Sequence, residues 1–148
     1  MRVVEVEDPA ERSRICERVL RDLPDWFGIE EATAAYIRDV AALPTFAARD
    51  DAFVSLKVHH PRAAEVYVMG VRRDRHREGL GNALLDAAEA YLGRLGVEFL
   101  QVKTLGPSDP DVGYARTRAF YAARGFVPLE ELHGFWEGNP CLILVKRL

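Results

Sequence analysis

The feature that most constrains the fold is a glycine-containing turn between a strand-like segment and the strongest helical segment of the chain. Glu65–Val71 is predicted as a strand, Arg72–Glu78 is a basic loop, and the helix Gly79–Leu95 begins with a Gly-Leu-Gly sequence. Free backbone N–H groups and the helix dipole at such an N-terminus favour an anion, and glycines keep side chains out of its way. The junction is therefore predicted to bind a phosphate-like anion.

The residues alone leave other interpretations of this turn open. A Rossmann dinucleotide site needs a third glycine three positions after Gly81, where the chain has Leu84. A P-loop needs Gly-Lys-Ser/Thr, which the turn lacks. The two glycines could also serve only to bring the helix close to a neighbouring element.

The order of predicted elements is β-α-α-β-β-β-α-β-α-β-β, with hairpins in the middle and strand–helix–strand crossovers later. This order predicts an α+β fold, a central mixed sheet with helices on both faces, in a single domain over residues 1–148. The remaining predicted strands are Arg2–Val6, Thr45–Arg49, Ala52–His59, Val97–Lys103, Phe126–Leu129 and Cys141–Lys146, and the remaining helices are Ala10–Leu23, Glu30–Leu43 and Ala115–Arg124.

Composition narrows the class of protein. The chain has 148 residues, 49% of them hydrophobic, and a formal net charge of −3, which argues against a nucleic-acid binder that relies on bulk positive charge. The longest apolar run, Cys141–Val145, is far too short to cross a membrane, and the N-terminal segment lacks the apolar core of a signal peptide. We expect a cytoplasmic protein that does not associate with membranes.

Metal binding is not expected either. Cys16 and Cys141 each lie in an apolar pattern without a ligand-like neighbour, and the four histidines do not repeat at helix-face spacing. Both cysteines are interpreted as buried small hydrophobic residues.

Two motifs resemble the GNAT family of N-acetyltransferases. The run from His76 to Gly81 is similar to the family's acetyl-CoA motif, Gln/Arg-x-x-Gly-x-Gly/Ala, with His76 in the first position. The run from Tyr121 to Phe126 matches the second signature, Tyr-x-x-x-Gly-Phe, although Tyr114 stands where the family often has an asparagine. The resemblance covers about residues 63–127 and implies a GNAT-like acyl-CoA N-acyltransferase fold.

The resemblance implies acetyl-CoA as co-substrate. The strand that ends at Val71 would splay from the strand Val97–Lys103, and the pantetheine arm would lie in the gap. The Met69 N–H would polarise the thioester carbonyl, Val71 would hold the pantetheine amides, and the backbone of the glycine turn would hold the pyrophosphate. The expected cofactor-binding residues are Met69, Gly70, Val71, His76, Arg77, Glu78, Gly79, Leu80, Gly81 and Asn82.

The same resemblance suggests catalytic residues. Tyr121 is the expected proton donor to the leaving thiolate, against the alternative of a core tyrosine. Glu65 is the expected base for the acceptor amine, through water, against the alternative of a solvated strand-edge acid. His59 and His60 are alternative bases, although exposed turn residues would look the same.

The acceptor site is expected between the first two helices. Trp26 and Phe27 would form an aromatic wall, and acids including Glu30 would attract a cation. The segment around Trp136 would close the other side, unless its aromatic ring only packs.

The function that these expectations favour is direct transfer of an acetyl group from acetyl-CoA to a primary amine of a small molecule or peptide. The alternative is a non-catalytic acyl-CoA-binding sensor of the same fold. Nucleic-acid recognition through the arginines of the basic loop is the weaker hypothesis, and a homodimer is possible.

Overall fold

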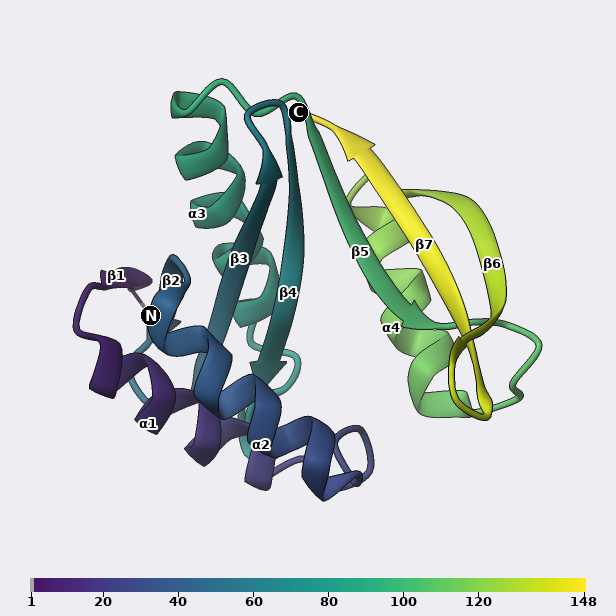
Figure 1. The fold of residues 1–148 in the computed structure, drawn as a ribbon. Helices are drawn as coiled ribbons and strands as arrows, with labels where there is room; N and C mark the ends of the chain where they lie inside the picture. The colour runs from purple at the N-terminus through teal and green to yellow at the C-terminus, as the bar shows by residue number, and fades with distance from the viewer. Residues whose placement is uncertain (1) are drawn as a thin grey trace.

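A computed structural model describes residues 2–148 as a seven-stranded sheet with helices on both faces (Figure 1). The strand order across the sheet is β1-β2-β3-β4-β5-β7-β6. The strands are β1 (Val4–Val6), β2 (Thr45–Ala48), β3 (Ala52–His60), β4 (Ala63–Val71), β5 (Phe99–Leu105), β6 (Val127–Trp136) and β7 (Asn139–Arg147). The helices are α1 (Pro9–Arg21), α2 (Glu30–Asp39), α3 (Leu80–Arg94) and α4 (Val112–Ala123), with short 3-10 turns at Val40–Ala42 and Arg73–Arg75.

The predicted order of strands and helices and the mixed sheet are confirmed. Within the described sheet β4 and β5 run parallel and the other neighbouring pairs run antiparallel. The largest difference concerns β6. The sequence pattern predicts that this strand ends at Leu129, and in the structure it continues to Trp136. Strands β6 and β7 thus form a long hairpin, whose bends use left-handed backbone at Gly134 and Gly138.

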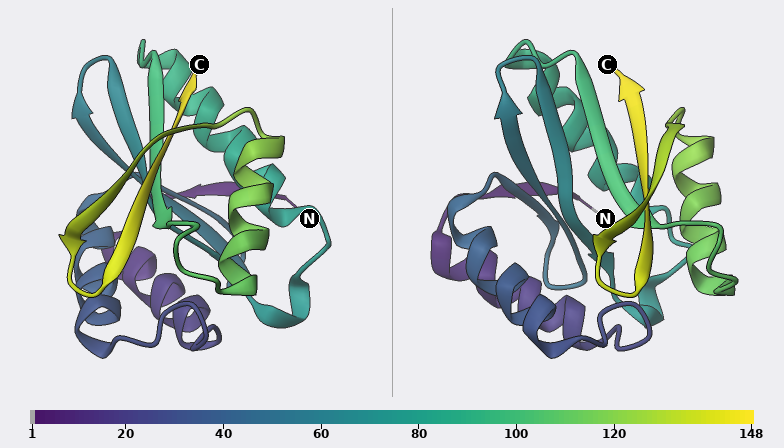
Figure 2. Two further views of the ribbon diagram at one scale, coloured as in Figure 1. Left: turned by 90° about the vertical axis from the view of Figure 1, so that its right-hand side faces the viewer. Right: turned by 45° about the vertical axis from the view of Figure 1, so that its right-hand side comes forward.

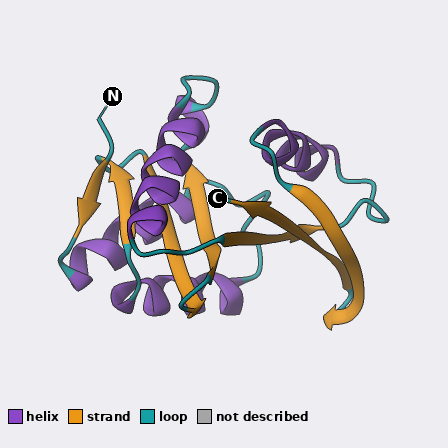
Figure 3. Ribbon diagram, turned by 90° about the horizontal axis from the view of Figure 1, so that it is seen from above, coloured by secondary structure: helices purple, strands orange, loops and turns teal. Residues whose placement is uncertain are grey.

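Two apolar cores lie on opposite faces of the sheet. Helices α1 and α2 cover one face and α3 and α4 cover the other (Figure 3). The core under α3 and α4 includes Leu84, Leu100 and Tyr121, and the core under α1 includes Val19 and Phe53. Cys16 and Cys141 are buried free thiols, as predicted.

The sheet opens between β4 and β5. These strands pair only from Ala63 with Phe99 to Val66 with Val102, and Tyr67 is the extra residue of a β-bulge against β3. Beyond that point β4 stays with β3 while β5 stays with β7, so the two halves diverge (Figure 2). The predicted splay is therefore present at the bulge.

Residues 2–148 contain neither a membrane-spanning helix nor a metal-binding cluster. None of the helices there has the length and apolar character needed to cross a membrane. No group of His, Cys, Asp or Glu side chains in the same range could hold a metal ion.

Close packing of α1 on β4 requires a glycine at position 70. A Cβ atom at Gly70 would lie 2.9 Å from Cγ1 of Val19. We expect Gly70→Ala to lower the free energy of unfolding by about 1–3 kcal/mol, because the added methyl group overpacks this core. Gly93→Ala, in α3 where an added Cβ would meet no described atom within 4 Å, should raise it by about 0.5–1 kcal/mol. Urea denaturation of both variants would contradict this packing if Gly70→Ala were as stable as Gly93→Ala.

Candidate active site

The open side of β4 presents backbone groups that the sheet does not use. The Arg72 N–H donates to the Asp51 carbonyl oxygen at 2.8 Å on the β3 side, and Gly70 pairs with Phe53 of β3. Hydrogen-bonding direction alternates along an antiparallel strand, so the N–H groups of Met69 and Val71 face away from β3. Because β5 has already diverged, these amides face the opening.

The loop after β4 leads into a helix start that can receive an anion. Arg77 and Gly79 have positive φ angles of 69° and 78°, and no side chain caps the N-terminus of α3. A Cβ at Gly79 would meet no described atom within 4 Å, so this glycine serves the backbone conformation and leaves open space. The first N–H groups of α3 are thus available, as predicted for a phosphate site.

Gly81 has a different role. A Cβ there would lie 3.1 Å from Cζ of Phe120 on α4. The close-packing interpretation of the turn therefore holds for this second glycine. It lets α3 and α4 approach each other on the side of the sheet that carries Tyr121.

The arginines of the basic loop are largely neutralised by acids. Salt bridges of 2.8–3.8 Å join Arg72 to Asp22 and Asp51, Arg73 to Asp25, and Arg75 to Asp51 and Glu78. Arg77 makes no ion pair with any residue in 2–148. The loop therefore offers an anion mainly the helix N-terminus and the Arg77 guanidinium.

His76 joins this loop to the β4 edge. Its Nε2 donates to the Val71 carbonyl oxygen at 2.7 Å, and the edge of its ring packs against Trp26 with ring centroids 6.0 Å apart. The sequence predicted a backbone role for His76 and gave no sign of this side-chain contact.

Tyr121 combines a buried ring with an unpaired hydroxyl. The residue is 5% exposed, and its ring stacks edge-on with Phe120 and Phe126 at 5.3 Å each. Its hydroxyl bonds to no residue in the described chain. Burial raises the pKa of Tyr121 well above its ordinary value, so the hydroxyl keeps its proton at neutral pH.

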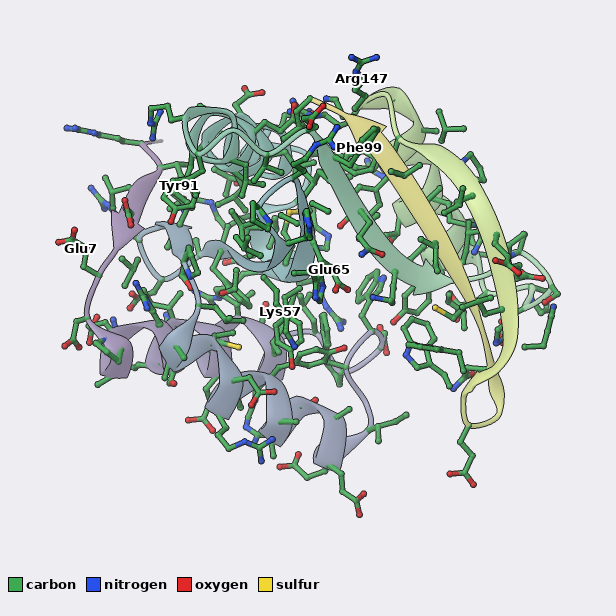
Figure 4. All side chains as sticks on the ribbon, turned by 45° about the horizontal axis from the view of Figure 1, so that its top comes forward. Glu7, Lys57, Glu65, Tyr91, Phe99 and Arg147 are labelled. Atoms are coloured by element: carbon green, nitrogen blue, oxygen red, sulfur yellow. The ribbon has the colours of Figure 1, made fainter. Side chains whose placement is uncertain are left out.

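Glu65 is held in a network instead of lying in solvent. It is 7% exposed and lies inside the molecule near Lys57, far from outer residues such as Glu7 (Figure 4). Lys103 Nζ on β5 donates to Glu65 Oε2 at 3.0 Å, and His59 Nε2 lies 2.6 Å from Glu65 Oε1. The alternative of a solvated strand-edge acid is wrong, and sequence reasoning missed Lys103.

The predicted acceptor residues separate into two groups. Phe27 stacks edge-on with Tyr36 of α2, and the Trp26 carbonyl accepts from the Tyr114 hydroxyl of α4 at 2.8 Å, so contacts with these two helices hold both residues in place. Glu30 instead lies on the outer surface of α2, where its exposed carboxylate pairs with Arg21 at 2.8 Å.

The β6–β7 hairpin reaches the same region. Residues 133–140 of this hairpin, Trp136 among them, line a surface hollow of about 610 Å³. The Phe135 ring centroid lies 5.9 Å from Lys103 Nζ, which in turn holds Glu65. The hairpin therefore borders the Glu65 network.

The unpaired hydroxyl of Tyr121 leads to a stability prediction. Tyr121→Phe should change the free energy of unfolding by less than about 0.5 kcal/mol, because no hydrogen bond within the described chain is lost. Tyr67→Phe is the matched control, since the Tyr67 hydroxyl donates to Asp39 Oδ2 at 2.7 Å. That control should lose about 1–2 kcal/mol. Equal losses in chemical denaturation would mean that the Tyr121 hydroxyl has a structural partner.

Comparison with known proteins gives one family and many similar folds. A profile of the family described as "Acetyltransferase (GNAT) family" matches residues 12–126. No curated protein matches the chain by sequence.

Three solved structures illustrate the similarity of fold. A protein assigned to the GNAT family of acetyltransferases from Desulfovibrio desulfuricans shares 18% identity at a TM-score of 0.82, over 99% of this chain and 98% of its own. The aminoglycoside 6'-N-acetyltransferase from Enterococcus faecium shares 17% identity at 0.72, over 99% and 97%. A GNAT acetyltransferase from Elizabethkingia anophelis, with acetyl-CoA bound, shares 14% identity at 0.66, over 85% and 88%.

Proposed function

The chain belongs to the GNAT acetyltransferase family, and we propose that it transfers the acetyl group of acetyl-CoA directly to a primary amine of a small molecule or peptide. The observation that carries the catalytic assignment is Tyr121, a residue only 5% exposed whose hydroxyl bonds to no residue in the described chain. A buried tyrosine kept only for packing would be expected to pair its hydroxyl with another residue.

The proposed cofactor site extends along the open edge of β4 to the start of α3. The amides of Met69 and Val71 are suited to bond the pantetheine arm, and the α3 N-terminus with Arg77 is suited to the pyrophosphate. Gly70 and Gly81 support this site through packing against α1 and α4. His76, Glu78, Leu80 and Asn82 complete the proposed set.

The transfer needs a neutral amine, a polarised carbonyl and a proton for the leaving sulfur. Bound acetyl-CoA supplies the thioester. The Met69 N–H polarises its carbonyl, the amine nitrogen forms the new C–N bond as the C–S bond breaks, and Tyr121 gives its proton to the sulfur. Glu65 is the proposed group for removing the amine proton, and Trp26 and Phe27 would line the site of the acceptor amine.

A thiol-release assay with a panel of amines tests this function. We expect turnover with at least one amine, and an upward thermal shift with CoA. Tyr121→Phe should keep the CoA shift and lower kcat by about 100-fold, because it removes a general acid. Tyr91→Phe, which alters a tyrosine stacked on Phe46 away from the proposed site, should behave as wild type.

The other outcomes identify the alternatives. A CoA shift without turnover on any amine would favour the acyl-CoA sensor. Salt-sensitive nucleic-acid binding without CoA would favour the nucleic-acid hypothesis. No CoA shift and no turnover would contradict the proposal.

A further inference from the structure

We propose that His59 carries the amine proton to solvent and that Glu65 is the positioning residue that holds it. This inference rests on the acetyl transfer proposed above and moves the role of base from Glu65 to His59, with Glu65 orienting the imidazole. The evidence is the shape of β3 at His59, the occupancy of the Glu65 carboxylate, and the charges around the pair.

A β-bulge sets the position of His59. Val58 pairs with Ala64 and His60 with Ala63, so His59 is the extra residue on β3. Bulges of this kind re-aim a side chain and are common beside active sites. Here the result is a 2.6 Å contact between His59 Nε2 and Glu65 Oε1.

The Glu65 carboxylate is poorly placed to be the last proton acceptor. Both of its oxygens are engaged, Oε1 by His59 and Oε2 by Lys103 at 3.0 Å, and its side chain is 9% exposed. Protonation would remove the negative charge from a buried ion pair with Lys103. The His59 side chain is 37% exposed, and its Nδ1 has no partner among residues 2–148.

Charged and polar groups from several elements surround the contact between His59 and Glu65. Lys57 of β3 and Lys103 of β5 supply positive charge on either side of Glu65. Tyr36 of α2, Tyr67 of β4 and Cys141 of β7 interact electrostatically with the Glu65 carboxylate, and burial raises the pKa of each, so they are neutral. A carboxylate only accepts hydrogen bonds, so Nε2 of His59 is the donor in this contact, and the proposal assigns the role of proton acceptor to Nδ1.

The protons balance in this scheme. A protonated amine loses two protons when it becomes an amide. The first passes to His59 Nδ1 and then to bulk water, and the second compensates for the one that Tyr121 gives to the thiolate. Met69 lies four positions after Glu65 on β4, a distance of about 13 Å along the strand, so water carries the first proton to His59.

Kinetics of matched histidine variants test the assignment. The acceptor is the most active amine of the panel, or water if no amine of the panel reacts. His59→Gln should lower kcat by about 100-fold and leave KM for acetyl-CoA unchanged. Imidazole should restore activity to His59→Ala. His60→Gln tests the other candidate base, whose Nδ1 accepts from the Arg62 N–H in its own turn, and a loss of kcat there as large as in His59→Gln would overturn the assignment to His59. Glu65→Gln should keep part of the activity.

The assignment is overturned if His59→Gln turns over as wild type while Glu65→Gln loses all activity, which makes Glu65 the base. Imidazole nitrogen chemical shifts of the protein alone decide the matter even if no amine reacts. A hydrogen on His59 Nε2 in the wild-type protein, no longer fixed on that nitrogen in Glu65→Ala, supports the assignment. A hydrogen on Nδ1 in the wild-type protein overturns it. Failure of the proposed function would instead appear as a wild-type protein with no CoA shift and no turnover.

Discussion

The structure depends on one interruption of the sheet, the end of β4–β5 pairing at Val66 and Val102. Beyond this point each of the two strands continues to pair with its other neighbour in the sheet. β5 pairs with β7 from Phe99 to Leu105, and β4 keeps β3 to Val71 with Tyr67 bulged out. Because β5 has diverged from β4 beyond Val66, the β4 amides that face the opening have no partner in the sheet, and such groups need another partner.

Helices α3 and α4 hold the two halves together behind the opening. Gly81 allows Phe120 to approach α3, and Arg124 of α4 donates to Asp86 and Glu89 of α3 at 2.7 and 2.8 Å. Lys146 of β7 donates to the same Glu89 at 2.8 Å. This network joins the β4 half to the β5–β7 half, so Tyr121 is fixed on one side of the opening while the Glu65 network borders the other side of the sheet.

The fold could be predicted from the sequence more fully than the contacts of the candidate site. The order of elements could be predicted because apolar periodicity, glycines and prolines are local signals. The pairing of Arg72, Arg73 and Arg75 with acids could not, since Asp22, Asp25 and Asp51 lie 20 to 50 positions away in the chain. The His59 contact depends on a bulge that no local pattern marks.

The central claim is that the β4 edge binds the pantetheine arm. Amide hydrogen exchange at single-residue resolution, with and without CoA, tests it most directly. CoA should slow exchange at Met69 and Val71, which face the opening, and leave Gly70 and Arg72, which face β3, as protected as before. Unchanged exchange at Met69 and Val71 under saturating CoA would contradict the account.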